Sequence, residues 1–278
     1  MSITDRIVEL RDDYLALNKI PGESVETLTV PQGSLVDLPL ALQRELGDAV
    51  PPAAPHRLDV PVSGCVLFAR NPRTLAFLGG CFREPGRVEK IYWGIAAPSR
   101  NAEDSGSLSL PGVPVPPEVL KPDPQGVPVP PEVLKPGPLG VPIPQEESPW
   151  VELVHWLAVG RGNRSLVYDE SGPGRKKGVL RYRVLGRGDR YLFLEIRLIT
   201  GRRHQIRAQL SHTGFSIKGD LKYGARRSEK GGGIRLHCRS LAFPDPAGGE
   251  RIIRVEAPPP EIDNLWRAFM DAAESRKL

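Results

Sequence analysis

The chain has 278 residues, a formal net charge of +5 and 40% hydrophobic residues, a composition typical of a folded protein rather than a wholly disordered one. It is long enough for one large domain or two small ones with a buried core. Its apolar runs are shorter than the roughly 18–20 residues of a membrane helix, and the charged N-terminus lacks the apolar region of a secretory signal, so we expect no membrane partner.

Charge is distributed unevenly along the chain. Residues 1–150 contain 13 Lys and Arg against 19 Asp and Glu, whereas residues 151–278 contain 25 against 14. The basic excess is mostly arginine and is densest between Arg161 and Arg239. A basic surface attracts polyanions and is typical of nucleic-acid binders, although a solvated basic surface without a partner explains the charge equally well.

Cysteine usage indicates the compartment. Cys65, Cys81 and Cys238 are an odd number and show no CxxC spacing. This argues against a disulfide framework and against a zinc site built from cysteines. The pattern favours a reducing cytoplasm as the location of the protein.

The first hundred residues alternate strand and helix patterns. Apolar stretches bounded by turn residues predict strands over 14–18 (YLALN), 64–70 (GCVLFAR) and 89–97 (EKIYWGIAA). Helical apolar spacing that stops at a glycine predicts a helix within 34–47. An Asn cap followed by Pro predicts a second helix over 71–84.

A proline-rich repeat interrupts the chain after these elements. The sequence GVPVPPEVLKP occurs at 112–122 and again at 126–136, and a degraded copy begins at Gly140. Proline at this density blocks helices and sheet interiors and favours polyproline II. We therefore predict that 105–148 is an extended loop inserted into a single domain spanning 1–278, and that repeat slippage is a better explanation for it than a proline-recognising partner.

The remainder of the chain is dominated by strands and closes with a helix. Strand patterns without strict βαβ alternation favour an α+β fold with a mixed, mostly antiparallel sheet flanked by helices. The predicted strands are WVELVHWLAVG (150–160), GVLRYRVLGRG (178–188), RYLFLEIRLITG (190–201), GIRLHCRSLAFP (233–244) and RIIRVEA (251–257), followed by a helix in 263–278.

Residues 197–224 (RLITGRRHQIRAQLSHTGFSIKGDLKYG) combine a strand end, a basic cluster and an amphipathic turn. Arginine, amide and histidine side chains at the start of a helix are suited to grip phosphates and to orient a polar substrate. Arg207 in this segment needs a carboxylate partner if it is buried. Asp59, in the segment HRLDVPVSG (56–64), is the candidate at another strand end, although a loop aspartate often only caps its own turn.

Five ordered segments resemble pseudouridine synthases of the RluA type. HRLDVPVSG resembles that family's HRLDxxTSG, and TGRRHQIRAQLSHTGFSIKGDLKYG resembles its TGRTHQIRxHLxxxGHPIxGDxxYG. Three shorter segments follow the family's NKPxG, KxYxAxV and LHAxxLxF patterns; they are NKIPG (18–22), KIYWGIA (90–96) and IRLHCRSLAF (234–243). The resemblance covers nearly the whole chain outside the insertion. It implies a pseudouridine-synthase-like catalytic fold with a central cleft.

The resemblance implies an isomerase that converts uridine in ribosomal or transfer RNA to pseudouridine, without a metal ion or an organic cofactor. The family's catalytic aspartate falls on Asp59, its second-motif tyrosine on Tyr92 and its paired arginine on Arg207. The carboxylate can act on the ribose as a nucleophile at C1′ or as a base at C2′, and both remain open. Arg207 orients Asp59, and Tyr92 stacks on uracil and helps remove the C5 proton.

The same resemblance implies RNA contacts around Asp59. A stacked uridine has to be flipped out, and basic side chains have to hold the distorted RNA. Arg57 is implicated in RNA contact and base flipping. The other expected RNA-facing side chains are His56 and His204, which we expect to orient loops rather than transfer protons, and Lys19, Arg202 and Arg203, which we expect to contact phosphates.

Two alternatives to this function remain. One is a catalytically inactive RNA-binding or RNA-folding protein with the same fold, which predicts loss of Asp59, Tyr92 or Arg207, although all three are present. The other is a metal-free glycosidase with paired carboxylates, for which Asp220 is the second candidate acid. For the leading hypothesis we expect a cytoplasmic monomer in which Asp59, Tyr92 and Arg207 converge.

Overall fold

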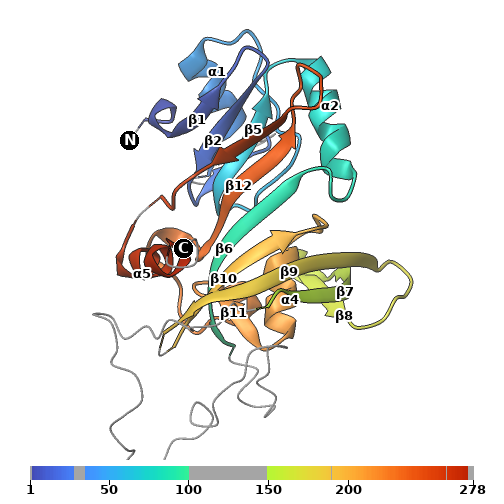
Figure 1. Ribbon diagram of the computed structural model, residues 1–278, viewed down its shortest axis with the longest axis vertical. Coiled ribbons are helices and arrows are strands. Elements are labelled where there is room, and N and C mark those ends of the chain that lie inside the picture. Colours follow the sequence, from blue (N-terminus) through green and yellow to red (C-terminus); the bar gives the residue numbers. More distant parts are fainter. Residues whose placement is uncertain (1, 28–34, 100–148, 189, 261, 275–278) are drawn as a thin grey trace, which may run out of the picture.

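The computed structural model describes residues 2–27, 35–99, 149–188, 190–260 and 262–274 (Figure 1). The predicted insertion at 105–148 lies outside the described residues, so its extended conformation stays a prediction. Within the described part, no helix is both long and apolar enough to cross a bilayer.

One mixed sheet organises the molecule. Its path runs β1-β2-β5-β12-β6-β10-β9-β7-β8, with β11 added to β6 and β13 added to β12. All described pairings in it are antiparallel except that of β5 with β12, so the predicted mixed, mostly antiparallel sheet is confirmed. The strands are β1 (Ile7–Leu10), β2 (Tyr14–Lys19), β5 (Ser63–Ala69), β6 (Glu89–Pro98), β7 (Val151–Val159), β8 (Ser165–Tyr168), β9 (Lys176–Arg187), β10 (Leu192–Leu198), β11 (Phe215–Ile217), β12 (Leu236–Pro244) and β13 (Ile252–Glu256).

Three helices begin where short polar side chains cap them. Asp37 accepts from the Leu40 N–H at 3.0 Å at the start of α1 (Leu38–Leu46), which ends at the left-handed Gly47. Asn71 accepts from the Thr74 N–H at 2.8 Å before α2 (Pro72–Arg83), as its sequence predicted. Asp263 accepts from the Trp266 N–H at 3.0 Å before α5 (Asn264–Glu274).

The C-terminal helix covers one face of the central strands. Trp266 and Phe269 of α5 are buried against Ile95 of β6 and Phe193 of β10. Burying one such aromatic side chain stabilises the fold by about 1.5–3 kcal/mol. Helix α5 is therefore held on the centre of the sheet, and Figure 1 shows it beside β6 and β12.

Several short elements were not predicted. The strands β1, β8 and β11 have three or four residues, and β3 (Glu23–Ser24) and β4 (Val36–Asp37) form a separate two-residue pair. Such lengths give too few positions for a periodic pattern, so only pairing to neighbours defines them. Among the described residues there are also four short 3₁₀ helices, at Thr4–Arg6, Arg161–Asn163, Leu221–Tyr223 and Lys230–Gly232.

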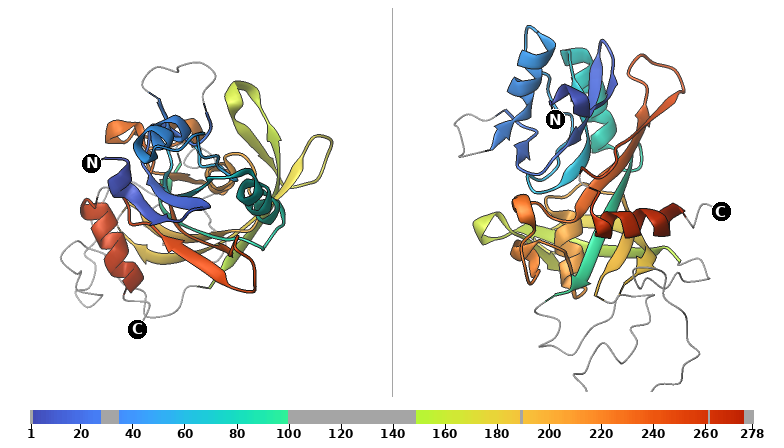
Figure 2. Two further views of the ribbon diagram at one scale, coloured as in Figure 1. Left: turned by 90° about the horizontal axis from the view of Figure 1, so that it is seen from above. Right: turned by 90° about the vertical axis from the view of Figure 1, so that its left-hand side faces the viewer.

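The sheet brings distant parts of the chain to one place. In Figures 1 and 2, β1, β2, β5, α1 and α2 lie at one end of the molecule, whereas β7 to β10 and α4 (Gln205–His212) lie at the other. The long strands β6 and β12 pair between these two ends. A loop that precedes β5 and the first turn of α4 can therefore meet near the middle.

Candidate active site

Asp59 lies in a tight turn just before β5. The Val62 N–H donates to the Asp59 carbonyl at 2.9 Å and closes this turn. Ser63 and Gly64 then enter β5, where Gly64 adopts φ +114° and runs beside β12. A Cβ at Gly64 would lie 2.2 Å from the Cys238 carbonyl oxygen, so the close approach of the two strands requires glycine.

The buried side chain of Lys19 stabilises this turn through hydrogen bonds to its backbone carbonyls. The side chain has 0% exposure, and its ammonium group replaces water for the carbonyls around it. Burial lowers the pKa of Lys19 to about 7, opposed by the charges of Glu23 and Asp59. The Lys19 side chain therefore does not face solvent, which argues against the predicted contact with an RNA phosphate. Its Nζ donates to the carbonyls of Ile20, Asp59, Val60 and Val62 at 3.1, 3.3, 3.0 and 2.6 Å.

Arg207, in the first turn of α4, joins two carboxylates. Its Nη1 donates to Asp59 Oδ2 at 2.8 Å, which confirms the predicted pair. Its Nε and Nη2 donate to the two oxygens of Asp220 at 2.6 and 2.9 Å. Burial alone would lower the pKa of Arg207, but the hydrogen bonds and charge of Asp220, together with Asp59, raise it above its ordinary value.

The two carboxylates differ in their access to solvent. The Asp220 side chain is 1% exposed and both its oxygens are engaged by Arg207, whereas the Asp59 side chain is 14% exposed. Asp220 is thus a buried counter-ion for Arg207. The paired-carboxylate glycosidase needs a second accessible acid, which Asp220 does not provide.

A hydrogen-bonded chain sets the tautomer of His204. The Ser165 N–H donates to the Tyr223 hydroxyl oxygen at 2.8 Å, which leaves the hydroxyl proton for His204 Nδ1 at 2.9 Å. Burial lowers the pKa of His204 to about 4, so the ring is neutral near pH 7. Its proton then lies on Nε2, which is 3.7 Å from Asp59 Oδ2. His204 therefore directs an N–H toward Asp59 from a left-handed backbone position, φ 50°.

Tyr92 lies on β6 in register with Cys238 of β12. It is buried, which raises the pKa of its phenol well above the ordinary value, with smaller contributions from Cys238 and from the charge of Asp59. The phenol is thus protonated at neutral pH and lies within electrostatic range of Asp59. The described contacts include no hydrogen bond between Tyr92 and Asp59, so the predicted convergence is confirmed for Asp59 and Arg207 and stays a prediction for Tyr92.

His56 faces the protein interior. Its Nε2 accepts from the Leu67 N–H at 3.0 Å, and its ring stacks on Phe82 with centroids 4.3 Å apart. Burial lowers the pKa of His56 to about 3, assisted by the charge of Lys90. The ring ties the Asp59 loop to β5 and α2, which fits the expectation of a loop-orienting role and leaves no contact for RNA at Nε2.

The arginines near the site differ in their exposure to solvent and in the partners they already have. Arg57 is 55% exposed and pairs with Glu26 at 3.0 Å, an exposed pair that an RNA phosphate can replace. Arg202 is exposed, and its Nε donates to the Lys177 carbonyl at 2.9 Å. Arg203 is half-buried, and its carbonyl accepts from Ser165 Oγ at 2.7 Å. Arg57 and Arg202 are therefore the more accessible cations.

Residues 13–212 match the family model of RNA pseudouridylate synthase, which spans the Asp59 turn, Tyr92 and Arg207. The chain belongs to the RNA pseudouridylate synthase family. The RluA-type resemblance is thereby confirmed, and so is the fold class it implied.

Curated relatives carry the same family name. An uncharacterized RNA pseudouridine synthase, YlyB of Bacillus subtilis, is 41% identical over 95 residues, 32% of this chain and 31% of that protein. Another from Chloroflexus aurantiacus is 28% identical over 247 residues, 87% of this chain and 62% of that protein. Ribosomal large subunit pseudouridine synthase D of Pseudomonas aeruginosa is 36% identical over 104 residues, 33% of this chain and 32% of that protein. The chain thus spans less than two thirds of the length of each of these relatives.

A solved structure agrees with the fold. The human RNA pseudouridylate synthase domain containing 4 has a TM-score of 0.60 and 18% sequence identity, and the match covers 98% of this chain and 94% of that one. At this identity the likeness establishes the family's fold alone.

Two contributors to the site, Tyr223 and Ser165, were not singled out from sequence. Tyr223 lies in the KYG end of the long second motif, so the family's GDxxYG pattern contained a signal for it. Ser165 contributes a backbone N–H and a hydroxyl from the start of β8, and a contact of this kind carries no sequence signal.

Proposed function

We propose that this protein is an RNA pseudouridine synthase in which Asp59 acts on a flipped-out uridine. The observation that carries the proposal is the half-buried Asp59, held 2.8 Å from Arg207 within the region that matches the family model. An accessible carboxylate beside a buried guanidinium is oriented for reaction at a ribose without being neutralised by full burial.

Asp59 begins the isomerisation at the ribose. Its carboxylate attacks C1′ or removes a proton at C2′, and either step releases uracil from its N-glycosidic bond. The base then rotates and bonds through C5, after which the C5 proton leaves. Tyr92 stacks on the uracil and assists this last step, while Arg207 and the Nε2–H of His204 hold the Asp59 carboxylate in place.

Exposed cations near the site provide the RNA-binding surface. The guanidinium of Arg164 lies 5.1 Å from the ring centroid of Tyr223. Lys222, which precedes Tyr223 in the chain, is exposed. Together with Arg57 and Arg202 they supply exposed positive charge for RNA phosphates, in keeping with the basic second half of the chain. These contacts hold the RNA backbone while the target base leaves its stack.

Ribosomal RNA of the large subunit is the first substrate to test, because relatives named ribosomal large subunit pseudouridine synthase D match this chain, and transfer RNA is the second. The basic enzyme then acts in the cytoplasm, as a monomer whose single domain spans residues 1–278.

The test maps pseudouridine in total RNA from cells with and without this protein. Pseudouridine sites that are lost in cells without the protein, and that are restored by the wild type but not by Asp59→Asn, identify the activity and its substrate together. Asp12→Asn is the matched control, because Asp12 is an exposed aspartate in the turn between β1 and β2 and should restore modification fully.

Binding measured beside modification separates the alternatives. If Asp59→Asn restores every site, or if no site depends on the protein while it still binds RNA, the inactive RNA-binding protein is the better account. Wild-type-dependent sites in transfer RNA alone would reassign the substrate and leave the activity in place.

A further inference from the structure

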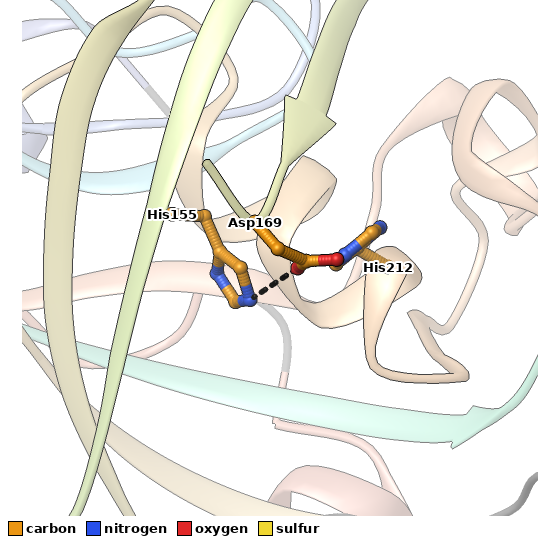
Figure 3. A group of neighbouring side chains, drawn as sticks. All are labelled: His155, Asp169 and His212. Atoms are coloured by element: carbon orange, nitrogen blue, oxygen red, sulfur yellow. Dashed lines mark hydrogen bonds and ion pairs between the residues drawn. The ribbon is translucent and has the colours of Figure 1, made fainter. Parts of the chain in front are cut away.

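A second cluster of ionisable side chains lies away from Asp59. It consists of His155 on β7, Asp169 just after β8 and His212 at the end of α4 (Figure 3). Asp169 Oδ1 lies 2.9 Å from His212 Nε2 and 3.9 Å from His155 Nε2. One ligand atom from each residue lies within 4.8 Å of the other two, so the three side chains are close enough to share one ion.

The donor set is characteristic of a particular class of cation. Two imidazoles and a carboxylate suit zinc and its neighbours in the transition series, whereas magnesium and calcium prefer oxygen ligands alone. Zinc binds nitrogen and oxygen at about 2.0–2.2 Å, which places tetrahedral ligands roughly 3.3 Å apart. Against this value the 2.9 Å separation has to lengthen and the 3.9 Å separation has to shorten, each by some tenths of an ångström, while the third separation lies within 4.8 Å. Asp169 and His212 are exposed and can make these shifts.

His155 has the buried support that metal-binding histidines use. Its Nδ1 lies 2.9 Å from Nε2 of the fully buried Gln209. Gln209 Oε1 has no hydrogen-bond partner. If the Gln209 amide is flipped, its Oε1 accepts a hydrogen bond from the Nδ1–H of His155, and Nε2 of His155 is left free to bind a metal. Flipping the amide breaks two long hydrogen bonds from Gln209 Nε2, to the carbonyls of Leu153 and Gly178 at 3.4 and 3.3 Å.

A simple ion pair is the competing explanation. A direct contact between Asp169 and His212 accounts for their 2.9 Å separation by itself. It would not account for His155, whose ring lies edge-on to His212 with centroids 5.1 Å apart. A single divalent cation between the three side chains would engage both rings and the carboxylate.

We propose that His155, Asp169 and His212 form a structural binding site for a zinc-like divalent transition metal, with water in the fourth position. The metal links the β7–β8 hairpin to the end of α4, and the other end of α4 carries His204 and Arg207. The site is independent of the proposed RNA chemistry, because none of its ligands contacts Asp59 or Arg207 in the described contacts.

Titration of the tag-free, chelator-treated full chain with Co²⁺ and Zn²⁺ tests the site. Wild type should bind one Co²⁺ with the visible absorption of a tetrahedral nitrogen and oxygen site, and Zn²⁺ should displace it. Asp169→Asn and His212→Gln should each weaken Zn²⁺ binding at least tenfold in calorimetry. Glu170→Gln, which removes the neighbouring exposed charge, should leave binding unchanged.

Two further measurements distinguish the site from adventitious binding. Saturating Zn²⁺ should raise the wild-type melting temperature and not that of Asp169→Asn, because binding to the folded state alone stabilises it. Nitrogen NMR should show the proton of His155 moving from Nε2 to Nδ1 as Zn²⁺ is added. The proposal is overturned if wild type binds no Zn²⁺ at micromolar concentration, or if Asp169→Asn and His212→Gln bind as tightly as wild type, which would leave the Asp169–His212 ion pair as the full account.

Discussion

Arg207 is the residue on which the candidate site depends most. A single guanidinium uses three nitrogens to engage Asp59 and Asp220, and its side chain is 5% exposed. Only a planar group with donors on two edges can satisfy both carboxylates at once. The arrangement commits Asp220 to Arg207 and leaves Asp59 accessible.

Replacing Arg207 with Lys should abolish most activity and reduce stability. Lysine keeps the charge but cannot make the three contacts, so a buried carboxylate is left without its partner. We expect a loss of about 2–4 kcal/mol in the free energy of unfolding. We also expect at least a hundredfold lower kcat, measured as release of tritium from RNA labelled at uridine C5. A variant with wild-type kcat would show that Asp59 does not need this orientation.

The tautomer of His204 gives a second prediction at this scale. Tyr223→Phe removes the hydroxyl that donates to Nδ1, so the proton no longer has to lie on Nε2 facing Asp59. We expect kcat to fall by about tenfold with KM nearly unchanged, because the Nε2–H of His204 is no longer fixed toward the charged Asp59. Wild-type kcat should show no His204 titration between pH 5.5 and 8, since burial lowers the pKa of His204 to about 4. An unchanged kcat in Tyr223→Phe would remove His204 from the site.

Among the elements, the turn before β5 decides where Asp59 points. The carbonyls of this turn accept from Lys19 Nζ and the Gly22 N–H in the segment 18–22, and from the Ile234 N–H just before β12. Buried carbonyls must be satisfied, so Lys19 holds the turn in one conformation. The position of Asp59 therefore depends on strand β2 as much as on its own loop.

Lys19→Met should loosen this turn. Leaving buried carbonyls unpaired costs about 1–3 kcal/mol, partly offset because a buried charge is removed. We expect faster amide exchange at Val62 and Gly64 and at least tenfold lower kcat, with RNA affinity little changed because Lys19 is not on the surface. A large loss of RNA affinity with unchanged exchange would instead support a phosphate contact.

At the scale of the molecule, one sheet connects residues far apart in sequence. Asp59 and Arg207 are joined because β5 pairs with β12, β12 with β6, and β6 with β10, the strand before α4. The same burial that builds this sheet encloses histidines. It lowers the pKa of His56 to about 3 and the pKa of His237 and His204 to about 4.

These buried histidines predict loss of stability in acid. Each has an ordinary pKa of 6.5, so between pH 6.5 and 4 the unfolded chain binds protons that the folded protein does not. Stability therefore falls as the pH drops through this window. Each histidine contributes roughly 1 kcal/mol between pH 6 and 5. In urea unfolding, His237→Gln should show a smaller pH dependence than wild type by about this amount, and equal slopes in the two proteins would contradict the argument.

Features carried by short stretches were predictable from sequence. The Asn71 cap, the Gly47 stop and the apolar strands β2, β5, β6 and β10 follow from local patterns, and the structure has them. The pairing of Asp59 with Arg207 was predicted from the need of a buried arginine for a carboxylate, with family motifs to support it. The short strands and the Ser165 contact were not, because their positions depend on neighbours distant in the chain.

The sequence by itself determined the family, the mostly antiparallel α+β fold and the Asp59–Arg207 pair, because motifs and hydrophobic periodicity can be recognised within short stretches of the chain. The tertiary structure alone decided which polar residues face solvent. It buried Lys19 under a turn, turned His56 inward and made Asp220 a counter-ion, although all three had been candidates for the site. Burial is the physical reason: a charge or donor becomes structural or accessible according to what packs over it, and packing is a property of the whole sheet.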